Sequence, residues 1–149
     1  MGRRAGFRWI FRSGRVSDRV ADLVDTNIAI YLRDSNPVVL ERMAGLDGRP
    51  FISIVTLVEL EGGAAHSAAS SEHRRRIDEL LSWVDVLPFG MAEAVEYGHI
   101  VQSSGYNRSR LLDRMIAAQA IAAGARLITI NGKDFTDIPG LNLEVWPAP

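Results

Sequence analysis

The sequence predicts an α/β fold, a three-layer sandwich with a mostly parallel central sheet and a short basic N-terminal extension. Short apolar runs that are typical of buried strands alternate along the chain with longer helical patterns. Strands separated by helices pair in parallel through right-handed crossovers, which place helices on both faces of a sheet. A length of 149 residues, 47% of them hydrophobic and 23% charged, suits one globular domain with a sizeable core.

Each predicted strand is a short apolar run bounded by polar or turn-forming residues. The predicted strands are residues 21–25, 50–55, 84–89, 125–130 and 143–146. The predicted helices are residues 27–34, 37–45, 56–68 and 71–83, a segment that ends near residue 103, and residues 112–123. Pro37 suits the first turn of its helix, and Gly124 suits the position that ends the last helix. The segment "GYNRSR" between the last two helices is expected to be a loop.

The charges are distributed unevenly along the chain. Residues 1–20 carry six Arg and one Asp, a net charge of +5, whereas the other residues carry 11 basic and 17 acidic side chains, a net charge of −6. We expect residues 1–20 to be a flexible basic extension and residues 21–149 to be one domain. An acidic domain that binds nucleic acid needs a cation or local basic patches to meet the phosphates.

The composition argues against membrane and thiol functions. No apolar run approaches the roughly 20 residues that span a bilayer, and residues 1–20 lack the apolar run of a secretory signal. The absence of cysteine excludes disulfides, thiol catalysis and cysteine-based zinc sites, and it agrees with a reducing compartment. The expected location is therefore the cytoplasm.

Several acids lie where predicted strands end or helices begin. Asp25 ends the first predicted strand, and a helix cap explains an Asp there equally well. Asp113 opens the most apolar predicted helix, where an acid is favourable in the first turn, but burial of that helix places its start at an edge of the sheet. Asn131 and Asp134 follow the strand at residues 125–130, and both also suit a turn.

Glu59 differs from these acids because it lies inside a predicted helix. Its neighbours at helical spacing are Val55, Val58 and Gly62. Two of these are apolar and one is small, so we expect the Glu59 side chain to point with the packing face of the helix. A carboxylate turned toward the interior needs either an arginine partner or a metal ion.

Together, four segments bring oxygen ligands to one end of a parallel sheet, the edge at which sites form in such folds. Crowded carboxylates repel one another, and a hard divalent cation that keeps some of its waters relieves this repulsion. An all-oxygen set of ligands favours Mg²⁺ or Mn²⁺, because zinc usually recruits histidine or cysteine.

From about residue 21 to residue 147 the chain resembles a PIN domain, and in particular the small ribonuclease toxins of bacterial VapBC toxin–antitoxin pairs. The order and spacing of four segments carry the resemblance: "LVDTN" (23–27), "ISIVTLVELEGG" (52–63), "LLDRMIAAQAIAAGARLITINGKDF" (111–135) and "IPGLNLEVW" (138–146). The resemblance implies acidic metal-site residues at Asp25, Glu59 and Asp113. Many family members have Asp directly after the last core strand, where this chain has Asn131. The fourth site residue is thus Asn131 or Asp134.

The resemblance further implies cleavage of RNA phosphodiester bonds by a Mg²⁺- or Mn²⁺-activated water, which leaves 5′-phosphate and 3′-hydroxyl ends. Asp25, Glu59, Asp113 and Asp134 are then the catalytic acids, with Asn131 as a further metal ligand. The implied partners are an RNA substrate, a cognate antitoxin protein and a second copy of the chain. Neither the RNA target nor the number of metal ions follows from the sequence.

Three arginines, Arg108, Arg110 and Arg114, flank Asp113 in the sequence. Basic side chains beside a nuclease site suit the phosphates of the RNA backbone, so these residues are candidate RNA contacts. The run Arg74-Arg75-Arg76 offers the same chemistry, but a solvated helix face explains it better.

Two alternative functions remain compatible with the sequence. A degenerate PIN module would bind RNA or a partner without cutting, and Asn131 favours this reading; metal binding without turnover would support it. An aspartate-based phosphoryl-transfer domain also places an Asp at the end of its first strand. The first strand here lacks the Asp-x-Asp-x-Thr pattern, and Lys133 would have to be the essential lysine. A stable phospho-aspartate would support this second alternative.

Overall fold

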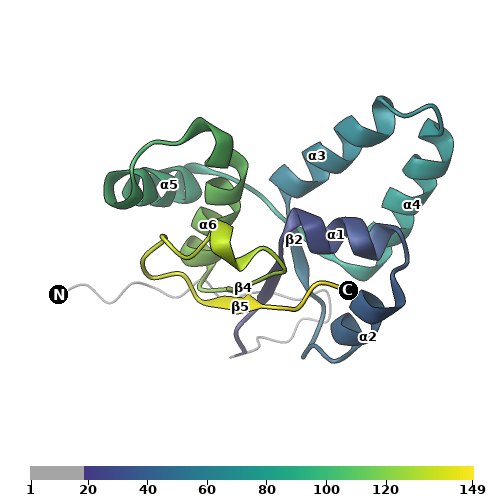
Figure 1. The fold of residues 1–149 in the computed structure, drawn as a ribbon, viewed down its shortest axis with the longest axis horizontal. Coiled ribbons are helices and arrows are strands. Elements are labelled where there is room, and N and C mark those ends of the chain that lie inside the picture. Colours follow the sequence, from purple (N-terminus) through teal and green to yellow (C-terminus); the bar gives the residue numbers. More distant parts are fainter. Residues whose placement is uncertain (1–18) are drawn as a thin grey trace.

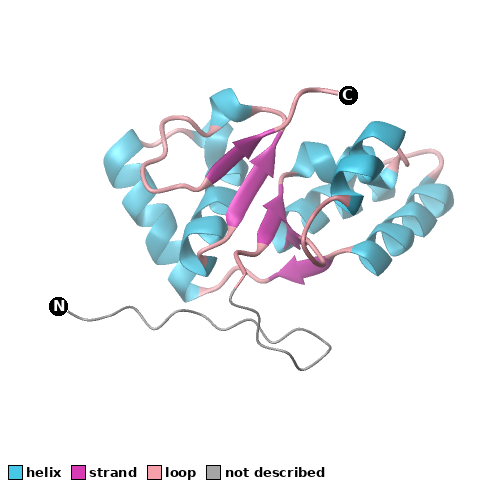
Figure 2. Ribbon diagram, turned by 90° about the horizontal axis from the view of Figure 1, so that it is seen from below, coloured by secondary structure: helices cyan, strands magenta, loops and turns pink. Residues whose placement is uncertain are grey.

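The structure is a computed structural model that describes residues 19–149, so the expectation for residues 1–20 lies almost entirely outside the described residues. The predicted fold class is confirmed: a five-stranded parallel sheet with the order β3-β2-β1-β4-β5 lies between two groups of helices (Figure 1, Figure 2). The strands are β1 (Asp22–Val24), β2 (Phe51–Ser53), β3 (Asp85–Leu87), β4 (Arg126–Thr129) and β5 (Leu143–Val145). The strand order reverses at the central strand β1, so the segments after β1 and β4 emerge side by side at the edge where sites form.

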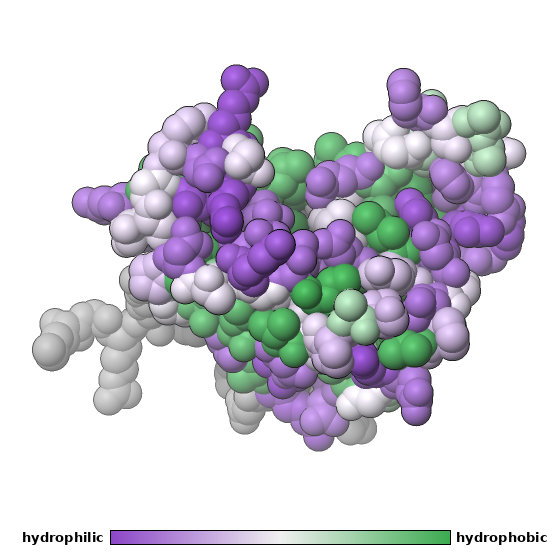
Figure 3. Space-filling model, in the orientation of Figure 1, coloured by the Kyte–Doolittle hydropathy of each residue, from purple (hydrophilic) through white to green (hydrophobic). Residues whose placement is uncertain are grey.

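Six α-helices and two 3₁₀ turns connect the strands. They are α1 (Thr26–Arg33), α2 (Pro37–Ala44), α3 (Ile54–Ala65), α4 (Ser70–Trp83), α5 (Met91–Ser104), η1 (Arg108–Arg110), α6 (Leu111–Ala123) and η2 (Gly132–Asp134). In Figure 1, α5 and α6 form one arm and α3 and α4 form the other. The same view in Figure 3 shows the surface hollowed between these arms, with polar and apolar residues side by side around the hollow. Within residues 19–149, every helix is too short or too polar to cross a membrane.

Successive residues of the central strands supply two separate cores. Leu23 and Leu127 pack into a cluster with residues of α5 and α6, whereas Val24 and Ile128 pack into a cluster with residues of α1, α2 and α4. All four side chains are fully buried. This is the alternation expected of strands that are covered on both faces, since neighbouring side chains of a strand point in opposite directions.

The predicted elements are all present, and their boundaries agree with the predicted ones to within three residues. The run at residues 50–55 was expected to be strand throughout, but α3 begins at Ile54. Ser53 ends the strand because its hydroxyl accepts a hydrogen bond from the backbone N–H of Val55 at 2.9 Å, and serine is a favourable helix cap. The expected loop "GYNRSR" contains the short helix η1. Gly124 ends α6 as predicted, with a left-handed φ of 62°.

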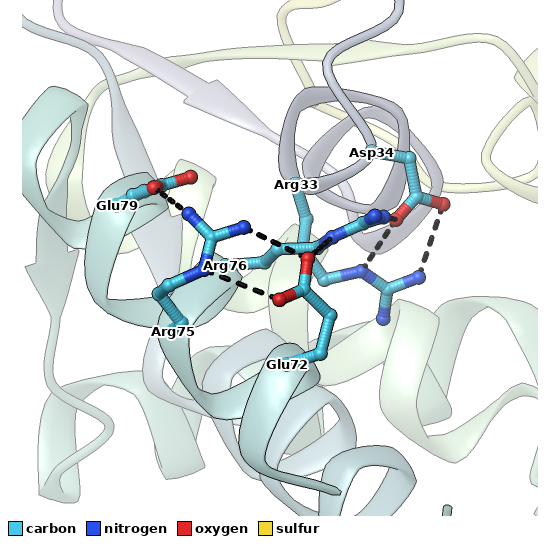
Figure 4. Close-up of polar contacts among 6 residues, drawn as sticks. All are labelled: Arg33, Asp34, Glu72, Arg75, Arg76 and Glu79. Atoms are coloured by element: carbon cyan, nitrogen blue, oxygen red, sulfur yellow. Dashed lines mark hydrogen bonds and ion pairs between the residues drawn. The ribbon is translucent and has the colours of Figure 1, made fainter. Parts of the chain in front are cut away.

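The arginine run on α4 is engaged by carboxylates (Figure 4). Arg75 pairs with Glu72 and Glu79, and Arg76 pairs with Glu72 and with Asp34 at the end of α1. These side chains are largely exposed, and such pairs contribute little to stability. The run therefore forms a solvated helix face, as the sequence favoured, and it links α4 to α1.

Candidate functional site

Asp25 is a buried helix cap at the end of β1. One carboxylate oxygen accepts a hydrogen bond from the backbone N–H of Ile28 at 3.0 Å, which caps α1. The other oxygen accepts a hydrogen bond from the hydroxyl of Thr129. The side chain is only 4% exposed, and this burial raises the pKa of Asp25 above its ordinary value despite the two hydrogen bonds. Capping therefore accounts for the position of Asp25, but among residues 19–149 no basic side chain pairs with its buried carboxylate.

Thr129 was not identified from the sequence, although it orients Asp25. It ends β4, which pairs with β1 so that Val24 lies opposite Ile128. Besides donating to Asp25, its hydroxyl accepts a hydrogen bond from the backbone N–H of Asn131 at 2.9 Å. Thr129 thus joins the end of β1 to the turn that carries Asn131. The signal was present in the chain as a threonine at the end of the strand adjacent to the one that ends in Asp25.

Asp113 lies in the first turn of α6, as predicted, and is partly buried. Burial, the largest cause, together with the neighbouring charges of Asp134, Asp25 and Glu59, raises the pKa of Asp113 to about 6, whereas Arg110 opposes the shift. The part of the shift that comes from charge requires these three carboxylates to lie near Asp113. The structure therefore brings together all four acids that the sequence singled out, from β1, α3, α6 and η2.

The expected orientation of Glu59 on α3 is wrong. Val58 and Glu59 are exposed, while the buried residues of that helix are Val55, Thr56, Leu60 and Ala64. Val58 resembles a core residue in the sequence but faces the solvent, so the apolar pattern indicated the wrong face. Glu59 nevertheless lies near the other acids, since its charge acts on Asp113 and its carboxylate accepts a hydrogen bond from Thr26, the residue after Asp25.

Two threonine hydroxyls hold the Glu59 side chain in place. The hydroxyl of Thr26, the first residue of α1, donates a hydrogen bond to Glu59 Oε2 at 2.7 Å. The hydroxyl of Thr56 on α3 lies 2.9 Å from that of Thr26. These contacts tie α3 to the start of α1 directly beside Asp25. Neither threonine was identified as a site residue from the sequence.

Asp134 and Asn131 lie on the turn after β4. Arg110 donates a hydrogen bond to the backbone oxygen of Asp134 at 3.0 Å, and its guanidinium lies 3.8 Å from the Asp134 carboxylate. Asn131 precedes η2 and is partly buried, and its side chain makes no capping hydrogen bond. Between them, a Cβ on Gly132 would lie 2.6 Å from a methyl carbon of Val145 on β5. Glycine is therefore needed there for the turn to pass so close to the last strand.

The fourth position is tested by single alanine substitutions. Asp134→Ala removes a charge from the acidic cluster, whereas Asn131→Ala removes a neutral oxygen. We expect Asp134→Ala to weaken Mn²⁺ affinity more than Asn131→Ala, and both to weaken it less than Asp25→Ala or Asp113→Ala, because the remaining three acids still supply −3. Isothermal titration of Mn²⁺ into the four variants measures this order. If Asn131→Ala were the most damaging, ligand geometry rather than charge would govern the site.

The donors of this cluster suit a hard divalent cation. The carboxylates whose charges raise the pKa of Asp113 would be stabilised by a positive ion among them. Arg110, the nearby cation, already pairs with Asp134. Within residues 19–149, however, no three acidic or histidine side chains form a ready-made set of metal ligands. A cation such as Mg²⁺, which keeps several waters and needs only one or two carboxylates, fits such an arrangement.

The three flanking arginines have different surroundings. Arg108 is exposed, and Arg110 contacts Asp134. Arg114 is only 2% exposed, and its guanidinium donates hydrogen bonds to the backbone oxygens of Gly105 and Ser104 and to Asp137. A buried guanidinium with these partners is not open to a phosphate, so the surroundings of Arg114 do not favour a direct RNA contact.

The family model of the PIN domain matches residues 23–141 of the chain. Among curated proteins, the chain is 33% identical over 127 residues to a tRNA(fMet)-specific endonuclease VapC of Shigella flexneri, covering 83% of this chain and 96% of the relative. It is 30% identical over 131 residues to the ribonuclease VapC2 of Rickettsia felis, with the same coverage of 83% and 96%.

Solved structures give the same result. One neighbour is VapBC2 from Rickettsia felis bound to a DNA fragment from their promoter, with a TM-score of 0.76, 28% identity and coverage of 85% of this chain and 99% of that chain. Another is VapBC-1 from nontypeable Haemophilus influenzae, with a TM-score of 0.72, 30% identity and coverage of 85% and 98%. The likeness thus spans nearly the whole of each relative.

Proposed function

The chain belongs to the PIN domain family, and we propose that it cuts RNA with a Mg²⁺ or Mn²⁺ ion held among Asp25, Glu59, Asp113 and Asp134. It is the ribonuclease toxin of a type II toxin–antitoxin pair, and its partner is an antitoxin protein. The metal requirement and the roles of single residues are the proposed part. The observation that carries them is the arrangement of four acids, from the end of β1, α3, the first turn of α6 and η2, around one edge of the sheet.

When bound, the divalent ion would lower the pKa of a water molecule and stabilise charge on the phosphodiester that is cut. The protein's own side chains fix where this chemistry takes place. Thr129 orients Asp25, and Thr26 orients Glu59 at 2.7 Å, so two of the acids have fixed carboxylate positions. Asp113 is anchored in the first turn of α6, and Asp134 is held against Arg110. These contacts reduce the reorganisation that substrate binding requires.

The geometry favours a nuclease over the phosphoryl-transfer alternative. That alternative needs Lys133 directed at Asp25, yet Lys133 is exposed and its side chain makes no hydrogen bond or ion pair among the described residues. The degenerate-module alternative rests on Asn131, but Asp134 supplies a charge within the same cluster. Four acids are thus available for a complete acidic site.

Removal of metal tests the proposed reaction. Purified protein incubated with RNA is expected to cleave it in Mg²⁺ or Mn²⁺ and to lose all cleavage in EDTA, with recovery when the ion is added back. The products should carry 5′-phosphate and 3′-hydroxyl ends. Undiminished cleavage in EDTA would overturn the metal requirement. Stoichiometric Mn²⁺ binding without any cleavage would instead favour the degenerate module.

We further propose that the chain self-associates through the exposed face of α5. Met91 is 86% exposed and Val95 is 57% exposed on α5, a helix whose one buried residue is Ile100. Such an apolar surface suits contact with a second copy of the chain, and light scattering measures the mass directly. We place the activity in the cytoplasm, where an RNA substrate is found.

A further inference from the structure

We propose that Tyr106, Arg108 and Lys133 form a contact surface for a single-stranded RNA segment, in which Tyr106 stacks on an unpaired base and the two cations bind phosphates. This inference rests on the proposed function, because it assigns the residues that hold the RNA beside the acidic cluster. Tyr106 and Lys133 have no role in the site described above.

The two cations are distinguished by having no partner. In the part of the chain that the structure describes, the side chain of every other arginine makes a hydrogen bond or an ion pair. The side chains of Arg108 and Lys133 make neither, and both residues are exposed. Where the other described cations already have partners, unpaired cations are the groups that can take up phosphates at little cost.

Both cations flank the acidic cluster. Arg108 lies on η1, which leads directly into α6 and Asp113, and Lys133 lies on η2 immediately before Asp134. The hydrogen bond from Arg110 to the Asp134 backbone holds η1 against η2 at 3.0 Å. Arg108 and Lys133 therefore lie on the two turns next to Asp113 and Asp134. Positive charge there favours the approach of RNA to an otherwise acidic domain.

Tyr106 lies on the same segment and is 71% exposed. The face of this exposed ring is open to stacking, and the fixed backbone on both sides keeps it in place. The loop is well held at both sides of the ring. The buried Arg114 guanidinium donates to the backbone oxygen of Gly105, whose φ is 78°. The Asn107 side chain accepts hydrogen bonds from the backbone N–H and the hydroxyl of Ser109 at 3.0 and 2.7 Å.

This combination of groups fits single-stranded RNA rather than a duplex. Stacking on a side chain requires a base that is splayed out of its own stack, and proteins that bind single strands combine such aromatic platforms with basic residues that follow the backbone. A duplex would engage only the two cations, because its bases are already stacked.

The test is RNA binding measured in EDTA by fluorescence anisotropy, with a fluorescein-labelled oligouridine as the probe and a duplex RNA of equal length for comparison. Tyr106→Ala is expected to weaken oligouridine binding roughly 5- to 150-fold, the effect of losing one base–aromatic stack, whereas Tyr106→Phe keeps the affinity. Arg108→Ala and Lys133→Ala should each reduce the slope of log affinity against log salt by about 0.7. Arg75→Ala, which removes an exposed but paired arginine on α4, is the matched control and should leave the slope unchanged.

The outcomes separate this inference from the proposed nuclease function. Cleavage in Mg²⁺ combined with unaltered oligouridine binding by all three alanine variants would overturn the contact surface alone. The expected losses in a protein that never cleaves RNA would support the contact surface and remove the nuclease proposal. Absence of oligouridine binding by the unmodified chain at low salt, or an equal effect of Tyr106→Ala on duplex binding, would overturn the stacking role.

Discussion

Asp113→Asn is expected to reduce RNA cleavage by at least about a hundredfold while the protein stays folded. Asparagine keeps the size and hydrogen-bonding capacity of the side chain but removes its charge from the acidic cluster. Loss of residues that merely orient metal ligands costs about 10–100-fold in metal affinity or activity, so loss of a proposed ligand should cost at least the upper value. Single-turnover cleavage at saturating Mg²⁺ and Mn²⁺ measures the effect. A variant that unfolds yet keeps its activity per folded molecule would show that Asp113 acts only in the first helical turn.

The same substitution should stabilise the metal-free protein at neutral pH. In the folded state the pKa of Asp113 is raised to about 6, above its ordinary value of 3.8. As the pH rises from about 4 to 6, the unfolded chain releases this proton first, so the free energy of unfolding falls and stays lower at higher pH. Asparagine at position 113 does not ionise, so the variant does not lose this part of the free energy of unfolding. After allowance for partial exposure, we expect a gain of about 1–2 kcal/mol at pH 7 and none near pH 3.

Urea unfolding in EDTA at the two pH values measures this gain. Asp47→Asn is the matched control, because the Asp47 side chain is 86% exposed and lies 3.7 Å from its arginine partner. The control should change stability little at either pH. Equal stability of the parent protein and Asp113→Asn at pH 7 would contradict the assignment of Asp113 to a cluster of mutually repelling acids.

Asp25→Asn should separate the two roles of Asp25. The asparagine oxygen still accepts the hydrogen bond from Ile28, so α1 keeps its cap, and asparagine caps helices as well as aspartate. The charge is lost, and we expect cleavage to fall by at least about a hundredfold. The amide nitrogen replaces the oxygen that accepts from Thr129, but the cost of this lost hydrogen bond is offset by removal of a buried charge, so stability should change little. Asp25→Ala is the companion variant. It also loses the cap and leaves the buried Thr129 hydroxyl without its acceptor, which costs about 2–4 kcal/mol in total.

Thermal unfolding and cleavage assays on both variants test this separation. Full cleavage by Asp25→Asn would show that Asp25 only caps the helix. Unfolding of Asp25→Asn at ambient temperature would show that its charge is needed for the fold itself.

The fold was predictable from the sequence because local signals agreed with the tertiary arrangement. Gly124 has the left-handed conformation that its place after an apolar helix predicted, and Pro37 occupies the first turn of α2. The end of β2 was misplaced because Ile54 and Val55 are β-branched and apolar, as strand residues usually are. The Ser53 side chain instead caps a helix, so α3 begins at Ile54, directly after Ser53.

The candidate site was predictable in position but not in its supporting contacts. Acids at the ends of β1 and at the start of α6 meet because parallel strands deliver their carboxyl ends to one edge. The orientation of Glu59 was wrong, since an exposed valine at position 58 imitates a buried one and only the packing of Leu60 decides between the faces. Thr26 and Thr129 were missed because their hydrogen-bond partners lie 33 and 104 residues away in the chain, although the place of Thr129 at the end of β4 was a usable signal.

The central claim is that one acidic cluster at the β1–β4 edge holds a catalytic divalent ion. The most direct measurement is anomalous diffraction from crystals of the protein soaked in Mn²⁺. We expect an anomalous peak between the carboxylates of Asp25 and Asp113, with oxygen ligands at about 2.1 Å, and its loss in Asp113→Asn. A crystal saturated with Mn²⁺ that shows no peak in this cluster, or one that shows the same peak in Asp113→Asn, would contradict the account.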